Sequence, residues 1–518
     1  MTIKINLERD KLFDALGLQR LRESYMMENE VSPQERFAYV SEAFGSNPEH
    51  AQRLYEYSSQ HWLSYSTPIL SFGRSKRGLP ISCFLNYMED SAEGLVDNLS
   101  ETNWLSMLGG GVGVHLGIRN SDDKSTGVMP HLKMYDASSL AYRQGRTRRG
   151  SYAAFLDISH PDIIQFLEMR KPTGDQNLRT LNLNHGVNIS DEFMELVERC
   201  MKDGDASDDW ALKNPANGEV VEVVSAKALW QKILDLRMQT GEPYLIFIDT
   251  ANRAMPEWLK EKGLKINGSN LCTEIFLPTS AERTAVCCLS SVNLEYYDDW
   301  KDNKQFIPDI MEMLDNVLEY FISNAPDHIR RAIRSATAER SVGLGSLGFH
   351  AYLQKNNMPI DGVMAKLTNR DIFRHISEEC KRADNLLFLK RGACEDAKLY
   401  GVHRRFSHHM AIAPNASSSL IMGNTSPSIE PYRANVFRQD TLSGAFVYRN
   451  RFLSKRLAEL GMDDDDTWAS IIANDGSVQH LDVPEDVKEV FKTAMEIDQR
   501  WLVELAADRQ AYIDQGQS

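Results

Sequence analysis

The chain has 518 residues, of which 42% are hydrophobic and 25% are charged, and its formal net charge is −15. This length leaves room for about two to four ordinary domains, or for one large α/β barrel with an appendage. No apolar run approaches the roughly eighteen residues that cross a bilayer, and the acidic balance argues against a nucleic-acid partner. Met1 is followed by a mixed charged segment, so we expect no signal peptide, no membrane attachment and a cytoplasmic location.

The cysteines limit the kinds of site that the chain can hold. There are seven, an odd number, and no two are spaced as CxxC, which argues against a disulfide framework and against a zinc site. We therefore expect reduced thiols and no metal site, with any disulfide forming as part of a reaction. The cysteines lie at positions 83, 200, 272, 287, 288, 380 and 394.

Residues 1–65 are predicted to be helical, because apolar residues recur there at helical spacing. A strand follows near residues 81–88 and carries Cys83, for which core packing is the simplest interpretation. The glycine cluster at 109–113 allows a ligand or another strand to approach the backbone closely. It is not part of a Walker A loop, because Asp123 precedes Lys124 where that motif needs glycine.

The next segments differ in polarity. Residues 143–149 contain four arginines, which suit either a solvated basic loop or a loop that binds phosphate and base edges. Residues 200–225 are polar and rich in turn formers, and we expect a surface excursion without chemistry there. Residues 307–400 are predicted to be mainly helical, and the segment from 486 onwards has a helical pattern.

The stretch 267–294 places Asn270, Cys272 and Glu274 at alternate positions. If the segment is extended, these side chains share one face. An amide, a thiol and a carboxylate together suit chemistry on a polyhydroxylated substrate. A structural cysteine beside two solvated polar residues fits the spacing equally well. Of the adjacent Cys287 and Cys288, only one can face such a site.

The sequence PNASSS at 414–419 offers hydroxyl and backbone N–H groups that suit an anion, although a plain serine-rich turn has the same composition. This segment is followed by SIEP. Together with SNLCTEI at 269–275 and the Cys-x-Leu-Ser pattern at Cys287, it resembles the large catalytic subunit of ribonucleotide reductase, class I-like. The resemblance covers nearly the whole chain from about Thr67.

The resemblance implies an α/β fold with a helical N-terminal region, residues 1–65, and a reductase barrel, residues 66–518. The barrel has ten strands in two parallel halves of five, with Cys272 on a central finger loop. It implies a thiyl radical at Cys272, a proton acceptor at Glu274, assistance from Asn270, and a redox pair of Cys83 and Cys287. The substrate contacts that it implies are Thr67, Ser82, Gly111, Asn415, Ala416, Ser417 and Ser418. The effector contacts are Asp90, Ser91, Arg119, Gln144 and Arg149.

The implied activity is reduction of ribonucleoside diphosphates to 2′-deoxyribonucleoside diphosphates for DNA synthesis. No cofactor is expected in this chain, because a metal-containing small subunit supplies the radical, with ATP and dNTPs as effectors. Thioredoxin or glutaredoxin is the expected reductant, and the chain is expected to form a homodimer.

We also expect the chain to start after the ATP-binding module of many large subunits and to end before the last barrel strands. It would then be a split subunit that needs a complementary C-terminal fragment. Two alternatives stay open: an adenosylcobalamin-dependent reductase of the same fold, and a catalytically silent nucleotide-binding remnant.

Overall fold

The computed structural model describes residues 3–75, 78–142, 150–204, 206–441 and 444–518. Its N-terminal region is helical, as predicted. Ser32 begins one of these helices with a capping box that it forms with Glu35, and Pro33 occupies the first helical position, where its missing N–H costs nothing. The elements are η1 (Leu7–Leu12), α1 (Ala15–Ser24), α2 (Pro33–Phe44), α3 (Pro48–Ser59) and α4 (Thr67–Leu70).

The first half of the barrel is a parallel sheet of five strands, in the order β2-β3-β4-β5-β8. Parallel neighbours require crossover connections, and helices supply them. The strands are β2 (Cys83–Glu89), β3 (Gly111–Gly117), β4 (Tyr152–Asp157), β5 (Asn184–Ile189) and β8 (Tyr244–Phe247). The helices between them are α5 (Ala92–Met107), α6 (Val128–Ala141), α7 (Ile163–Glu168), η2 (Gln176–Leu178), α8 (Asp191–Lys202) and α9 (Ala226–Thr240).

The second half starts with β9 (Ala285–Asn293), whose residues are all buried. This strand runs antiparallel to β2 and parallel to β10 (Val342–Leu347), so the two halves meet at the β2–β9 pair. Parallel bridges continue from Leu344 to Met410 and from Ile412 to Gln517. The short strand β1 (Leu63–Tyr65) pairs antiparallel with residues 290–292 of β9, beyond its pairing with β2, and ties the N-terminal region to the sheet. The result is the expected α/β architecture, with eight strands in one curled sheet over the described residues.

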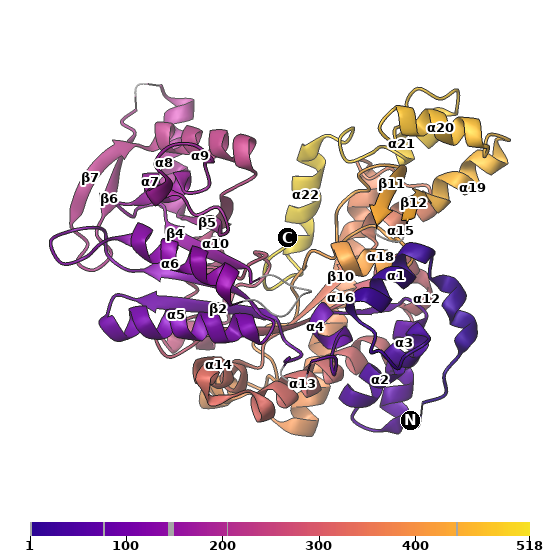
Figure 1. Cartoon of the computed structure of the whole chain (residues 1–518), viewed down its shortest axis with the longest axis horizontal. Helices are drawn as coiled ribbons and strands as arrows, with labels where there is room; N and C mark the ends of the chain where they lie inside the picture. Colours follow the sequence, from indigo (N-terminus) through magenta and orange to yellow (C-terminus); the bar gives the residue numbers. More distant parts are fainter. Residues whose placement is uncertain (1–2, 76–77, 143–149, 205, 442–443) are drawn as a thin grey trace.

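Helices cover the second half. In Figure 1, α22 stands between the two lobes of the molecule, and the C-terminal residues below it run toward the centre. Elements between β8 and β10 are α10 (Ile248–Ala254), α11 (Glu257–Glu261), η3 (Leu294–Tyr296), α12 (Tyr297–Trp300), α13 (Phe306–Asn324), η4 (Asp327–Ile329) and α14 (Arg330–Glu339). After β10 come α15 (Phe349–Lys355), α16 (Val363–Arg391), α17 (Glu395–Leu399), α18 (Ala416–Ile421), β11 (Val436–Thr441), β12 (Gly444–Arg449), α19 (Arg451–Glu459), α20 (Asp465–Ala473), α21 (Glu485–Val490) and α22 (Gln499–Gln510).

Two segments differ from the sequence-based expectation. The polar stretch 200–225 contains a β-hairpin, β6 (Asp209–Lys213) and β7 (Val220–Ser225). Its alternation of apolar and polar residues is hidden in the sequence, because β7 is mostly exposed on both faces. The segment from 486 onwards is two helices rather than one, and the chain beyond α22 enters the sheet. None of the helices within the described residues is long and apolar enough to span a membrane.

Candidate active site

A closed loop, residues 265–279, enters the barrel between α11 and β9, and we call it the finger loop. Its base is held by hydrogen bonds from Thr279 N to Lys265 O, 3.1 Å, and from Asn267 Nδ2 to Thr279 O, 2.9 Å. The barrel wall is shaped to admit it, because a Cβ at Gly113 of β3 would lie 1.8 Å from Ser269 O. Only glycine at this position lets the loop and the strand approach so closely.

The tip of the finger loop is a turn and not the extended segment considered from the sequence. Thr273 N donates to Asn270 O, 3.2 Å, and Thr273 has a φ of 65°. The Asn270 side chain stabilises the turn, because its Oδ1 accepts from the backbone N–H groups of Glu274 and Ile275, each at 3.1 Å. Alternation along a strand therefore does not bring Asn270, Cys272 and Glu274 together. The turn brings Asn270 and Glu274 together, because the Asn270 side chain accepts from the Glu274 N–H.

Cys83 and Cys287 lie directly opposite each other on the antiparallel strands β2 and β9. Directly opposed residues of such a pair have Cα atoms about 4.5–5.5 Å apart, which is within the range that a disulfide spans. All seven cysteines are thiols here. Cys288 is also buried, but its neighbour Cys287 is the one in register with Cys83. The register therefore places Cys287, and not Cys288, opposite Cys83.

Glu274 brings a carboxylate to this pair. Cys83 Sγ lies 3.9 Å from Glu274 Oε1, and Glu274 is 1% exposed. Its Oε2 is buried and has no hydrogen-bond partner among the described residues. Burial raises the pKa of Glu274 to about 7, although hydrogen bonds from its own backbone N–H and from Asn270 oppose the rise. A carboxyl group with this pKa can exchange a proton near neutral pH.

The thiols share this low-dielectric environment. Burial raises the pKa of Cys83 well above its ordinary value, and negative charge on Glu274, Cys272 or Cys287 would raise it further. Burial also raises the pKa of Cys287 to about 12, against hydrogen bonds from Gln515 and Ser341. Both thiols therefore stay protonated at neutral pH and hold hydrogen atoms for transfer.

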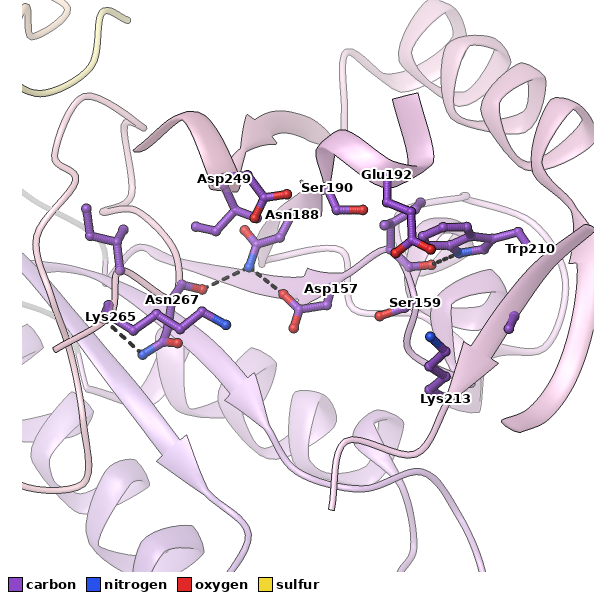
Figure 2. Close-up of a pocket in the computed structure, with 14 residues that line it drawn as sticks. Asp157, Ser159, Asn188, Ser190, Glu192, Trp210, Lys213, Asp249, Lys265 and Asn267 are labelled. Carbon is purple, nitrogen blue, oxygen red and sulfur yellow. Dashed lines mark hydrogen bonds between the residues drawn. The ribbon is translucent and has the colours of Figure 1, made fainter. Parts of the chain in front are cut away.

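The base of the finger loop is fixed at the carboxyl ends of the parallel strands. Asn188, the residue before the last of β5, donates from Nδ2 to Asn267 O and to Asp157 Oδ1, both at 2.8 Å (Figure 2). A cavity of about 200 Å³ opens around these residues, and Lys213 of β6 and Lys265 also line it. Asn188 therefore ties the start of the finger loop to the carboxyl end of β5.

A second cavity, of about 490 Å³, lies where the N-terminal helices meet the barrel. Its lining includes Thr67 and Ser417, two of the expected substrate contacts, and two cations, Arg20 and Arg74. Gly109 also lines this cavity.

The remaining expected substrate contacts lie around these elements. Gly111 N donates to Ser82 O at the start of β2, and a Cβ at Gly111 would lie 2.9 Å from Leu271 of the finger loop. The Asn415 side chain is bound inside the protein, with Nδ2 donating to Ser346 O and Ala413 O. Asn415 precedes α18, which holds Ala416, Ser417 and Ser418 and has no side-chain cap, so its first backbone N–H groups can meet an anion.

The expected effector contacts are brought together in part. Arg119 Nε donates to Asp90 Oδ2 at 2.6 Å, just beyond the carboxyl ends of β2 and β3. Ser91 caps α5 by accepting from Gly94 N at 3.0 Å. Gln144 and Arg149 lie outside the described residues.

Sequence reasoning missed two residues that contact Cys287. Gln515 Nε2 lies 3.6 Å from Cys287 Sγ, and Ser341 Oγ lies 3.9 Å from the same sulfur. Neither residue shares a periodic pattern with a cysteine in the sequence. Only the folded second half of the barrel brings them to Cys287.

The comparisons with known proteins agree with this geometry. The family model described as "Ribonucleotide reductase, barrel domain" matches residues 81–400 and 391–518, and "Ribonucleotide reductase, all-alpha domain" matches residues 11–78. The chain belongs to the ribonucleotide reductase large-subunit family. It is 50% identical to the ribonucleoside-diphosphate reductase large subunit of Invertebrate iridescent virus 3, over 100% of this chain and 90% of that protein.

Other relatives give the same result. The putative large subunit of Frog virus 3 is 50% identical over 92% of this chain and 83% of that protein. Among solved structures, the Actinobacillus ureae class Id ribonucleotide reductase alpha subunit superposes with a TM-score of 0.85 at 36% identity, covering 99% of this chain and 91% of that one. The finger loop and the β2–β9 pair therefore belong to a ribonucleotide reductase barrel.

Proposed function

We propose that this ribonucleotide reductase chain reduces ribonucleoside diphosphates to 2′-deoxyribonucleoside diphosphates by thiyl-radical chemistry. The observation that carries the proposal is the set of reactive groups where β2, β9 and the finger loop meet. Cys83 and Cys287 are in register on neighbouring strands, and Glu274 lies 3.9 Å from Cys83 Sγ. Cys272 occupies the turn at the tip of the same loop, two residues before Glu274.

The three thiols have different roles. Cys272, as a thiyl radical, removes the 3′ hydrogen of the ribose and returns it at the end of the cycle. Glu274 accepts the 3′-hydroxyl proton, which its pKa of about 7 allows. The 2′-hydroxyl leaves as water with a proton from Cys83. Cys83 and Cys287 together give up two electrons and two protons and become a disulfide, so C2′ exchanges its hydroxyl for hydrogen.

The Nδ2 group of the Asn270 amide is available to bind the substrate. Its Oδ1 is occupied by the N–H groups of Glu274 and Ile275, and its Nδ2 can donate to a ribose hydroxyl. The nucleotide lies over the finger loop, against Ser82, Gly111 and the cavity lined by Thr67. Its diphosphate meets the first turn of α18, at Asn415 to Ser418, where Arg20 and Arg74 of the cavity supply positive charge.

A second nucleotide acts as effector at the Asp90–Arg119 pair, with Ser91, Gln144 and Arg149 as further contacts. This position is next to a surface that suits a second copy of the chain. The helices α5 and α6 expose the apolar side chains of Val96, Met134 and Leu140. Such an exposed apolar group gains free energy when a protein surface covers it. A homodimer that pairs these helices would cover them and place the effector at the interface.

The activity requires other proteins. A thiol does not form a radical unaided, so a metal-containing small subunit supplies it, and thioredoxin or glutaredoxin reduces the resulting disulfide. The setting is the cytoplasm.

The test is reduction of radiolabelled CDP with ATP and dithiothreitol. The chain is assayed with a small subunit, and in parallel with adenosylcobalamin alone. Product that forms with the small subunit and disappears in Cys272→Ser supports the proposal. Product with adenosylcobalamin and no partner would favour the cobalamin-dependent alternative. Binding of dTTP without product in any mixture would favour a silent remnant.

A further inference from the structure

The residues that follow α22 lie beneath the finger loop and beside the redox pair. Gly516 N donates to Glu274 O at 2.8 Å, and a Cβ at Gly516 would lie 2.4 Å from the Phe276 ring. Gln515 N donates to Met410 O at 3.2 Å. The segment therefore forms a floor for the half of the loop that carries Glu274.

We propose that Gln515 is a positioning residue that holds the Cys287 thiol and the finger loop in one fixed arrangement for the radical reaction. The inference rests on the proposed function, because that function makes Cys287 a redox thiol. Gln515 itself need not touch the substrate.

The Gln515 amide connects the two parts of the site through opposite ends. Its Oε1 accepts from Phe276 N of the finger loop at 3.3 Å. Its Nε2 donates to Val342 O of β10 at 3.2 Å and faces Cys287 Sγ at 3.6 Å. A flipped amide would set its NH2 group against the Phe276 N–H and its oxygen against a carbonyl, so the orientation is determined by the partners.

Burial makes these contacts matter. Gln515 is 4% exposed and Cys287 is 1% exposed, so water does not replace a donor that is removed. The N–H group aimed at Cys287 Sγ favours the thiolate, which is the form that attacks a disulfide. The second donor, Ser341 Oγ, is more distant, at 3.9 Å. Gln515 therefore supplies the shorter of the two contacts to this sulfur.

A purely structural glutamine would behave differently from a positioning one. If Gln515 only filled space, a side chain of the same length without hydrogen-bonding groups would preserve the reactivity of Cys287. If it only stabilised the fold, its loss would expose Cys83, Cys287 and Cys288 together. The positioning role predicts that Cys287 alone reacts more slowly, whereas a loss of fold stability would make all three thiols react faster.

The experiment measures the alkylation rate of each cysteine by iodoacetamide from pH 7 to pH 10, with peptide mass spectrometry, in the full chain. Gln515→Met keeps the length and removes both hydrogen bonds. Gln517→Met is the matched control, because the Gln517 side chain donates to Ala506 O at 2.9 Å and to Gln510 Oε1 at 2.7 Å, both in α22.

In Gln515→Met, we expect the pKa of Cys287 to rise by about one unit. The thiolate fraction then falls about tenfold, and because the more basic thiolate is more nucleophilic, Cys287 should react about three- to fourfold more slowly at every pH below its pKa. Cys83 and Cys288 should react at the wild-type rate, and Gln517→Met should match wild type throughout. Unchanged alkylation of Cys287, or faster alkylation of all three thiols, would overturn the inference.

The alkylation assay needs no nucleotide and no partner protein, so it separates this inference from the proposed function. Where the chain reduces CDP, Gln515→Met should lower kcat at least tenfold and leave KM unchanged, because Gln515 is not among the residues that line the substrate cavity. A change in KM alone would contradict the positioning role. A chain that fails to reduce CDP but shows the selective effect at Cys287 would contradict the function and not the geometry.

Discussion

Replacement of Glu274 by glutamine should change the pH dependence of stability as well as the activity. The pKa of Glu274 is raised from 4.5 to about 7 by burial. The folded chain therefore binds this proton more tightly than the unfolded chain does. The associated stability is fully present below about pH 4.5 and is lost as the pH rises through about 7.

The size of the effect follows from the shift. A rise from 4.5 to about 7 corresponds to about 3.5 kcal/mol, at roughly 1.4 kcal/mol for each pKa unit. Glutamine is neutral at every pH, so its burial adds no pH-dependent cost to stability. The stability of Glu274→Gln relative to wild type should therefore be about 2.5 kcal/mol greater at pH 8 than at pH 5, because a smaller part of the shift lies below pH 5.

The assay is urea unfolding of both proteins at pH 5, 6, 7 and 8. Glu282→Gln is the control, because Glu282 is an exposed residue close in sequence to the finger loop. A stability difference between Glu274→Gln and wild type that is the same at pH 5 and pH 8 would refute the reasoning. CDP reduction should fall by about 10²–10⁴-fold in Glu274→Gln, and in wild type it should rise with pH up to about 7.

Three further predictions concern the loop, the thiols and the effector. Gly113→Ala should lower stability by about 3 kcal/mol or more, because its Cβ would lie 1.8 Å from Ser269 O; in Gly204→Ala, where the Cβ meets nothing within 4 Å, thermal unfolding should stay near wild type. Mild oxidation with diamide should join Cys83 to Cys287, and peptide mapping that finds Cys288 in the disulfide instead would contradict the register of β2 and β9. Arg119→Ala should weaken dTTP binding at least tenfold in calorimetry, because it removes the partner of Asp90 at 2.6 Å, and unchanged affinity would place the effector elsewhere.

Much of the site could be predicted from the sequence, because its motifs are local. The segment around Cys272 contains a carboxylate, an amide and a thiol within five residues; their spacing left a structural cysteine equally possible, and the resemblance of the whole segment indicated the chemistry. The choice of Cys287 over Cys288 came from the resemblance, and the register of β9 with β2 supports it. The parallel first half and the helical N-terminal region were also predicted correctly.

The rest depends on contacts between distant residues. The turn at the finger-loop tip is stabilised by the Asn270 side chain and a positive φ at Thr273, which alternation does not reveal. The strands β6 and β7 were missed because β7 is exposed and polar residues dominate that stretch. Gln515 lies 228 positions from Cys287 in the chain, so no local pattern could have linked them.

The most direct test of the central claim is a single-turnover experiment. The prereduced chain, with its radical-generating partner and effector but no external reductant, is given labelled CDP, and product and disulfides are counted in the same sample. We predict one deoxynucleotide for each Cys83–Cys287 disulfide formed, and neither in Cys272→Ser. Deoxynucleotide formed without this disulfide, or with a disulfide between other cysteines, would contradict the account.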